Sequence, residues 1–310
     1  MPGSGAADTH QLVWVDRNGG VESLPFEPRT SWYADLSPDD QRIALQIQQD
    51  GAWDIWIYEV ERGGSGVRLT TEGSNQVPIW SADGEWVFFA SDRGGNQDIW
   101  KRRADRSLDA ELVLDTEADV WPASISADGE MLLFESGPYT NQDIGMLALN
   151  PGPEPEPEMI VATAADEGRS SFSPDGRFFA FMSSETGEYE VYVREVSSGR
   201  TFPVSTSARG GQYPLWSKDG TEIHYIPSNN SSGILAAEVD LESFSASAPV
   251  ELSDIVMRRE TPVEATADGE KFLVTVPIGR DELGGPAFGT RLNVILNWFE
   301  ELRRLVPTDP

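Results

Sequence analysis

The stretch "SPDGRFFAFMS", Ser173–Ser183, places an Asp-Gly pair directly before a run of aromatic and small apolar residues. In such a turn Ser comes first, Pro presets the φ angle of the second position, Asp accepts local hydrogen bonds, and Gly adopts the left-handed conformation that closes the turn. The apolar run has the length and composition of a β-strand. The stretch therefore predicts a β-hairpin in which Asp175 belongs to the turn.

The same turn motif recurs along the chain, and the repeat sets the fold. Its six copies begin at Ser37, Ser81, Ser126, Ser173, Ser217 and Thr266. Successive copies are 44, 45, 47, 44 and 49 residues apart, which is the length of one four-stranded blade of a β-propeller. In the first copy Asp40 replaces Gly, and Asp tolerates the left-handed region better than most residues. A catalytic residue is not expected six times around a ring, so the repeated Asp is interpreted as turn chemistry.

Each unit continues with a second hairpin and an outer strand. In the second unit, "SDRGGNQDIW" (Ser91–Trp100) predicts a Gly-rich loop and a third strand, and "ELVLDT" (Glu111–Thr116) predicts the outer strand. The proline-rich stretch "NPGPEPEPEMI" (Asn150–Ile160) falls between the third and outer strands of the third unit. We therefore expect an extended loop insertion there and not a linker between domains.

The two ends of the chain complete the ring. "LVWVDRNGGVESLP" (Leu12–Pro25) has the pattern of third and outer strands without partners, and "KFLVTV" (Lys271–Val276) that of a second strand. One blade built from both ends would leave no free sheet edge. "NWFEELRRLVP" (Asn297–Pro307) predicts a short C-terminal helix. The expected fold is all-β: a six-bladed propeller of four-stranded antiparallel blades over residues 11–310, after a disordered tail or cloning remnant at 1–10.

Composition limits the classes of partner. The chain has 310 residues, with 52 acidic and 23 basic side chains and a formal net charge of −29. This charge repels nucleic acid and anionic lipid, both of which require cationic surfaces. No run approaches the roughly 18 apolar residues of a membrane-spanning helix, and "MPGSGAADTH" lacks the pattern of a signal peptide. The absence of cysteine excludes disulfides and thiolate sites, and the natural compartment stays open.

The repeat also resembles a known family. From Thr71 to Trp100 the pattern T…PxWSxDGxxxxFxSxRGGxxDIW is similar to the TolB-like (WD40-like) propeller repeat, and the likeness covers about Leu12 to Trp298. The combination of "LVWVDRNGGVE" and "LNVILNWFEEL" resembles the C-terminal propellers of bacterial membrane-bound serine/threonine kinases and related regulators. The resemblance implies an extracytoplasmic or periplasmic sensing or protein-binding module of a bacterial protein. Kinase motifs themselves are absent from the sequence.

The sequence offers little for catalysis. Its only histidines are His10, in the expected tail, and His224, in an expected second strand. There is no GxSxG elbow, no histidine cluster for a metal and no DxDxDG calcium loop. We therefore expect no catalytic residue, no dedicated metal ligand and no cofactor, and leave open a divalent cation such as calcium in the central channel.

A propeller offers its channel mouth as a site, because its innermost strands line a central channel. Counting four to six residues back from each turn motif gives a ring of aromatic, amide and charged groups, a mixture that binding surfaces favour. The predicted binding residues are Trp32, Tyr33, Gln76, Trp121, Glu167, Arg169, Gln212, Tyr213 and Glu260. The alternative for the aromatic rings is packing between blades.

Two functions follow from this pattern. The first is a non-enzymatic, monomeric sensor or scaffold that binds a protein, a peptide or a small molecule at the channel mouth. The second is a carbohydrate-active hydrolase or lyase that uses paired channel carboxylates as general acid and base. The acidic residues in or just before innermost strands are Asp119, Glu167, Glu260 and Glu264.

Overall fold

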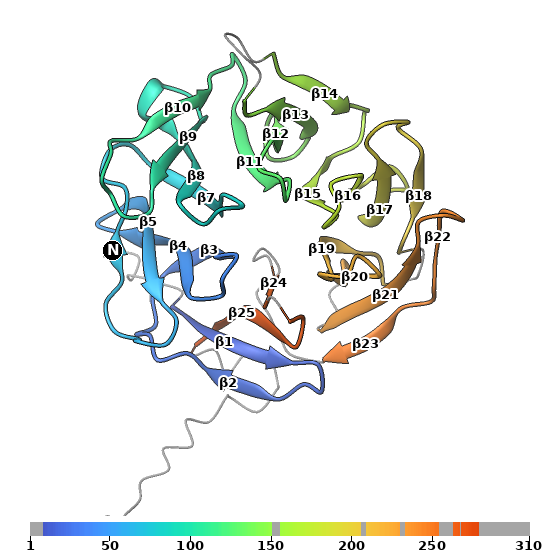
Figure 1. Ribbon diagram of the computed structural model, residues 1–310, viewed down its shortest axis with the longest axis horizontal. Helices are drawn as coiled ribbons and strands as arrows, with labels where there is room; N and C mark the ends of the chain where they lie inside the picture. The colour runs from blue at the N-terminus through green and yellow to red at the C-terminus, as the bar shows by residue number, and fades with distance from the viewer. Residues whose placement is uncertain are drawn as a thin grey trace, which may run out of the picture. The chain divides into compact units, whose positions relative to one another are not determined.

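The computed structural model describes residues 9–150, 156–205, 209–229, 233–253, 263–266 and 268–278. The unit that runs to Pro277 contains six antiparallel sheets arranged around a central axis (Figure 1). The sequence prediction of a six-bladed propeller is confirmed. A separate unit begins at Ile278, and the helix predicted over 297–307 lies outside the described residues.

Blades 1 to 3, numbered by their turn motif, each have four strands that follow one another from the axis outward. Blade 1 consists of β3 (Ser31–Leu36), β4 (Arg42–Gln49), β5 (Ala52–Glu59) and β6 (Val67–Arg68). Blade 2 consists of β7 (Asn75–Trp80), β8 (Trp86–Ser91), β9 (Asp98–Arg103) and β10 (Glu111–Leu114). Blade 3 consists of β11 (Val120–Ile125), β12 (Met131–Ser136), β13 (Asp143–Ala148) and β14 (Glu158–Val161). The proline-rich segment lies between β13 and β14, as predicted.

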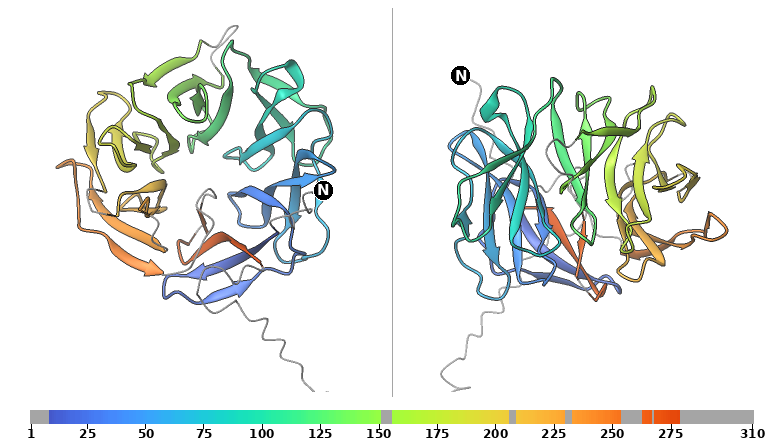
Figure 2. Two further views of the ribbon diagram at one scale, coloured as in Figure 1. Left: turned by 180° about the vertical axis from the view of Figure 1, so that it is seen from behind. Right: turned by 45° about the horizontal axis from the view of Figure 1, so that its top comes forward.

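Blades 4 and 5 repeat this plan, and the outer edge of blade 5 is split into two short strands that both pair with β21. Blade 4 consists of β15 (Glu167–Phe172), β16 (Phe178–Ser183), β17 (Glu190–Glu195) and β18 (Thr201–Pro203). Blade 5 consists of β19 (Gln212–Trp216), β20 (Glu222–Ile226), β21 (Ile234–Asp240), β22 (Ser245–Ala246) and β23 (Val250–Ser253). The rotated views of Figure 2 show the same sheets from behind and tilted.

Blade 6 joins the two ends of the propeller. Its inner strands are β24 (Glu264–Ala265) and β25 (Lys271–Pro277), and its outer strands are β1 (His10–Asp16) and β2 (Val21–Ser23). β1 pairs with β25 along its whole length, from His10 opposite Pro277 to Asp16 opposite Lys271. The prediction of a blade closed by both chain ends is confirmed. His10, assigned to the tail in the sequence analysis, is instead the first residue of β1 and is buried, because its backbone pairs in this sheet.

The turn motif has the predicted hydrogen bonds. In blade 4 the Ser173 hydroxyl donates to Asp175 Oδ1 at 2.6 Å, and the Phe178 amide donates back to Ser173 Oγ at 3.0 Å. The same hydroxyl–carboxylate bond occurs in all six copies, at 2.5 to 2.7 Å. This hydrogen bond lowers the pKa of the turn carboxylate at Asp39, for example. Asp40 has a φ of 58°, so it occupies the left-handed position that Gly fills in the other copies.

The core lies between neighbouring blades. All six residues of β16 are buried, and its Phe178 joins Phe202 of the same blade in a cluster with Trp216 and Tyr225 of blade 5. A lone blade could not cover both of its faces, so the apolar faces of the sheets stabilise the ring only when the blades stack around the axis.

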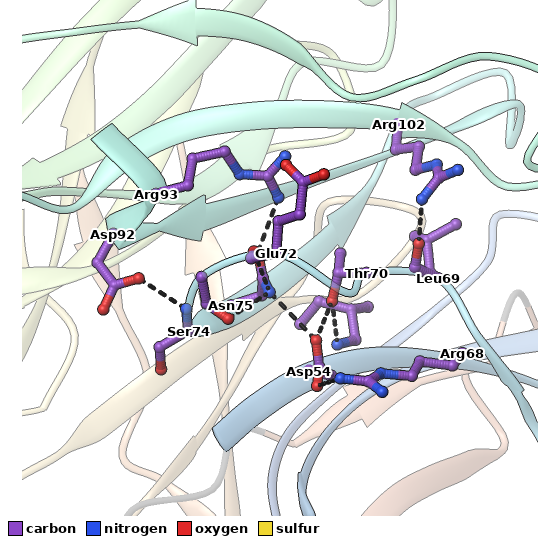
Figure 3. Close-up of polar contacts among 12 residues, drawn as sticks. Asp54, Arg68, Leu69, Thr70, Glu72, Ser74, Asn75, Asp92, Arg93 and Arg102 are labelled. Carbon is purple, nitrogen blue, oxygen red and sulfur yellow. Dashed lines mark hydrogen bonds and ion pairs between the residues drawn. The ribbon is translucent and has the colours of Figure 1, made fainter. Parts of the chain in front are cut away.

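A buried polar network supplements this packing between blades 1 and 2 (Figure 3). Asp54 on β5 is completely buried and accepts hydrogen bonds from Thr70 at 2.9 Å, from Asn75 at 3.2 Å and from Arg68. Arg93 of blade 2 then donates to Asn75 Oδ1 at 3.1 Å. Since each oxygen of Asp54 has a donor, its burial is compatible with a stable fold.

Candidate functional site: the central cavity

A cavity of about 480 Å³ occupies the axis of the propeller and is lined by residues from all six innermost strands. The lining residues fall into levels around the axis. Each level contains the residues that precede the turn Ser or Thr of their blade by the same number of positions. The level two residues before the turn consists of Asp35, Ile79, Ser124, Ser171, Leu215 and Glu264. The level four residues before the turn contributes Tyr33, Val77, Pro122, Arg169 and Tyr213. The lining also reaches the turns themselves, where Pro38, Ala127, Pro174 and Lys218 are exposed.

The inner strands of blades 1 to 5 all break register at or directly after the second of these levels. At the break Val77, Arg169 and Tyr213 have φ angles of 49°, 54° and 53°. A β-branched residue such as Val rarely adopts this left-handed conformation, so the backbone is strained there. Bulges of this kind redirect a side chain, and backbone strain concentrates at functional sites.

Buried side chains on the neighbouring blade satisfy the amides at these bulges. Val77 N donates to Gln46 Oε1 at 3.0 Å, and Arg169 N donates to Glu135 Oε1. Gln46 and Glu135 occupy the same position in their blades, nine residues after the turn Ser. In blade 2 that position is Ala90, and the bulge of the next blade offers a proline, which has no amide hydrogen to satisfy. In blades 1 to 3 the acceptor is therefore present only where the bulge of the next blade has an amide hydrogen.

Arg169 spans the channel at the level of the bulges. Its guanidinium lies 5.3 Å from the ring centres of both Tyr33 and Tyr213, and 3.3 Å from Glu135 Oε2. Tyr33 belongs to blade 1, which lies across a six-bladed ring from blade 4. Burial raises the pKa of the Tyr33 phenol well above its ordinary value, so this ring is neutral at physiological pH. The charge of Arg169 is thus balanced by Glu135 and covered by two aromatic faces.

Two carboxylates meet in the cavity where the first and last blades adjoin. Asp35 on β3 and Glu264 on β24 both line the cavity, and their strands pack together. Burial raises the pKa of Asp35 to about 7, and hydrogen bonds from the backbone amides of Trp80, at 2.5 Å to Asp35 Oδ2, and of Leu36 oppose this increase. Burial and the charge of Asp35 raise the pKa of Glu264 well above its ordinary value. The pair therefore resists losing both of its protons.

The predicted binding residues divide into two groups. Tyr33, Arg169 and Tyr213 come together in the wall of the cavity. Gln76 and Trp121 do not line it, and both instead contact Tyr139 of blade 3. The Tyr139 hydroxyl donates to Gln76 Oε1 at 3.0 Å, and its ring lies 4.6 Å from that of Trp121.

Trp32, Gln212 and Glu167 also lie outside the cavity lining. Trp32 packs against Trp53 with 5.4 Å between ring centres, and Gln212 begins β19 opposite Ile226. Glu167 is 1% exposed and accepts a hydrogen bond from Thr163. Glu260 lies outside the described residues.

Of the three carboxylates proposed for acid–base chemistry that the structure describes, Asp119, Glu167 and Glu264, only Glu264 lines the cavity. Asp119 accepts a hydrogen bond from the Gln97 amide at 2.9 Å and lies outside the lining. Asp35, the partner of Glu264, was not among the sequence candidates. It stands two residues before its turn Ser, as Glu264 stands two residues before Thr266, so a shorter count back from the motif locates both.

In the part of the chain that the structure describes, no three His, Cys, Asp or Glu side chains come together as a metal site. Across the same residues, no helix has the length and apolar character to span a membrane.

The fold and its axial cavity define the protein as a six-bladed β-propeller. More particularly, residues 30–156 match the family profile of the TolB beta propeller domain, so this part of the chain is similar to TolB propellers. An uncharacterized protein of Agrobacterium fabrum is 32% identical over 126 residues, 40% of this chain and 42% of that protein. An uncharacterized peptidase of Bacillus subtilis, YuxL, is 26% identical over 202 residues, 51% of this chain and 31% of its own length. The chain thus spans less than half the length of these curated relatives.

Solved structures share the fold at low identity. A structure described as TolB from Agrobacterium tumefaciens has a TM-score of 0.69 and 14% identity, covering 89% of this chain and all of that one. An oligogalacturonate lyase from Vibrio parahaemolyticus has a TM-score of 0.51 and 12% identity, covering 86% of this chain and 90% of the lyase. Proteins with this fold include enzymes, so the fold leaves the activity undecided.

Proposed function

We propose that the protein is a non-enzymatic binding module that takes a protein segment, a peptide or a small molecule into its central cavity. The cavity carries this proposal. Its volume of about 480 Å³ lies in the range of ligand pockets. Its walls combine apolar side chains such as Ile79 and Leu215 with a few polar groups, among them Arg169 and Ser171. Such a mixture suits a ligand held by apolar contact and oriented by a few hydrogen bonds.

The residues that line the cavity also indicate the end from which a ligand would enter it. The cavity reaches exposed residues of the turns, including Pro38, Pro174 and Lys218. At its other end the Arg169 side chain crosses between Tyr213 and Tyr33. A ligand would therefore enter from the turn end and meet the Arg169 group last.

A pair of matched substitutions tests this proposal. Leu215→Trp fills the cavity, and Leu112→Trp adds the same side chain on the exposed outer strand β10. Ligands are first selected on the unaltered protein from phage-displayed peptides and from a metabolite panel screened by thermal shift. We expect Leu215→Trp to abolish binding of these ligands and Leu112→Trp to leave it unchanged. Ligands that bind equally well to a folded Leu215→Trp protein would place the site elsewhere, and Ser171→Phe provides a second cavity-filling variant.

The carboxylate pair favours a second candidate function, a carbohydrate-active hydrolase or lyase. A carboxyl group with a raised pKa can donate a proton near neutral pH while its neighbour acts as a base or nucleophile. Asp35, with a pKa of about 7, would be the acid and Glu264 its partner. The fold shared with an oligogalacturonate lyase supports carbohydrate as the substrate class to test first.

A glycan screen separates the two candidates. Neutral and acidic oligosaccharides are incubated with the protein, and the products are measured by mass spectrometry. The binding proposal expects no turnover. Turnover that is lost at least a hundredfold in both Asp35→Asn and Glu264→Gln would favour the enzyme, and turnover retained by both variants would point to a contaminant.

A further inference from the structure

The cavity level two residues before the turns has an uneven distribution of chemistry. The carboxylates Asp35 and Glu264 stand side by side on blades 1 and 6. The hydroxyls of Ser124 and Ser171, on blades 3 and 4, line the other side of the ring. Aliphatic side chains occupy blades 2 and 5 between them. A ligand in the cavity therefore meets a carboxyl side, a hydroxyl side and two apolar walls.

Several of these polar groups lack hydrogen-bond partners within the described residues. Among these residues Glu264 has no hydrogen-bond donor, whereas Asp35 accepts hydrogen bonds from the backbone amides of Trp80 and Leu36. The Ser170 hydroxyl, on a residue that is 3% exposed and lines the same cavity, has no partner either. Buried polar groups are ordinarily satisfied, so these groups indicate an occupant that supplies donors.

The charges of the lining favour a cationic occupant. Arg169 is paired with Glu135 and stacked on tyrosine rings, so its charge is neutralised locally. Lys218 lies at the exposed turn end of the cavity. Asp35 and Glu264 have no such cation beside them among the described residues. Their shared negative charge would be relieved by a positive group placed between them.

The geometry favours an organic cation over a metal ion. A divalent ion is normally held by several oxygen or nitrogen ligands at short distance, and two carboxylates alone are too few for a tight site. No group of three candidate ligands occurs in the described part of the chain. An ammonium group needs only a few acceptors, and the hydrocarbon that carries it gains from apolar walls such as Ile79 and Leu215.

We infer that the central cavity binds a protonated primary amine, with the ammonium group between Asp35 and Glu264 and its hydrocarbon stem against Ile79 and Leu215. This inference rests on the proposed binding function and names the chemistry of the ligand. A lysine side chain of a peptide and a free alkylamine share this chemistry. Two arms of the test distinguish them.

Calorimetric titrations at pH 8 use n-pentylamine, cadaverine and Nα-acetyl-lysine amide as probes. Nε-acetyl-lysine amide and n-pentanol are their uncharged counterparts. We expect the amines to bind and the uncharged compounds to bind at least tenfold more weakly. Tighter binding of Nα-acetyl-lysine amide than of n-pentylamine would identify a peptide side chain as the preferred source, and the reverse order a free amine. The absence of amine binding at millimolar concentration would overturn the inference.

Substitutions locate the ammonium group. Asp35→Asn and Glu264→Gln keep the size of each side chain and remove its charge, and each is expected to weaken amine binding at least tenfold. Glu188→Gln, on an exposed loop residue, is the matched control and should bind as the unaltered protein does. Thermal melting checks that the variants are folded. Unchanged affinity in both cavity variants, or displacement of the amine by calcium at equal concentration, would contradict the assignment.

The proton balance gives an independent readout. The carboxylate pair keeps a proton near pH 6.5, which the ammonium group should displace. Titrations at pH 6.5 in phosphate and Tris, which differ in ionisation heat, should show proton release, and affinity should increase between pH 6 and pH 8. Affinity that does not depend on pH would exclude the pair. If amines fail to bind while Leu215→Trp still blocks selected ligands, the binding function stands and only the amine inference falls.

Discussion

Two sets of enclosed carboxylates differ sharply in how the protein surrounds them. Asp54, between blades 1 and 2, has hydrogen-bond donors on both oxygens, from Arg68, Thr70 and Asn75. Asp35 and Glu264 line the cavity where blades 1 and 6 adjoin, and among the described residues their hydrogen-bond donors are the backbone amides of Trp80 and Leu36, both on Asp35. The first arrangement fixes neighbouring blades, whereas the second leaves acceptors available to a ligand.

This contrast predicts opposite effects of removing charge. Loss of a saturated buried carboxylate leaves its donors unsatisfied and destabilises the fold. Loss of one member of a repelling pair removes an unfavourable interaction and stabilises it. The sign of the change in stability is therefore a direct test of the comparison.

The largest effect is expected at Asp54. Asp54→Ala leaves the buried Thr70 hydroxyl without its acceptor, removes the ion-pair partner of Arg68 and takes one acceptor from the Asn75 amide, and should lower the free energy of unfolding by about 3 kcal/mol. Urea denaturation measures this difference. Asp109→Ala, at an exposed position, is the control and should have no measurable effect. If Asp54→Ala changed the free energy of unfolding by less than about 0.5 kcal/mol, Asp54 would not be important for joining the blades.

Glu264→Gln should shift stability the other way. At pH 8 we expect the free energy of unfolding to increase by about 1–2 kcal/mol, since the repulsion with Asp35 is lost and each pKa unit corresponds to 1.36 kcal/mol. The same urea experiment serves, with Glu188→Gln as the control. A loss of stability would show that Glu264 has a stabilising partner and would end the contrast with Asp54.

The carboxylate pair should also make stability depend on pH. The pKa of Asp35 is about 7 in the folded protein and 3.8 as its ordinary value. Between about pH 4 and 7 the folded state holds more protons than the unfolded state, so this contribution to stability decreases as pH rises. The melting temperature of the unaltered protein should fall more over this range than that of an Asp35→Asn/Glu264→Gln double variant. Parallel profiles would contradict the raised pKa values.

The smallest effect concerns two hydroxyls. Thr70 donates to Asp54 and accepts from the Ile55 amide at 2.9 Å, so Thr70→Val should cost about 1 kcal/mol. Ser171 lines the cavity and its hydroxyl has no hydrogen bond within the described residues, so Ser171→Ala should change stability little. Differential scanning calorimetry compares the two. Equal losses would show that the cavity hydroxyl is satisfied in the folded protein.

Much of the fold could be predicted because it depends on local turn chemistry. The Ser–Asp hydrogen bond and the left-handed position at Gly176 or Asp40 involve residues close in sequence. Six evenly spaced copies then specify six blades, and the unpartnered strand patterns near both ends specify the closed last blade. His10 was placed in the tail because its single position carries no strand pattern, and only pairing with β25 makes it part of a strand.

The site was predicted less well because it depends on side-chain direction. Counting back from the turns located Tyr33, Arg169 and Tyr213 in the cavity wall. Trp121 satisfied the same count but is 2% exposed and packs between blades. The bulges decide which side chains point to the axis. The bulge at Arg169 depends on Glu135 of the neighbouring blade, so the sequence around Arg169 does not reveal it.

The sequence by itself determined the blade count, the turn geometry and the closure of the ring, since hydrogen bonds within a few residues and a regular repeat encode all three. Tertiary structure alone decided which side chains share the axis. Asp35 and Glu264 lie near opposite ends of the chain and become neighbours only when blade 6 closes against blade 1. Their raised pKa values arise from that enclosure and, for Glu264, also from the charge of Asp35, which no local pattern contains.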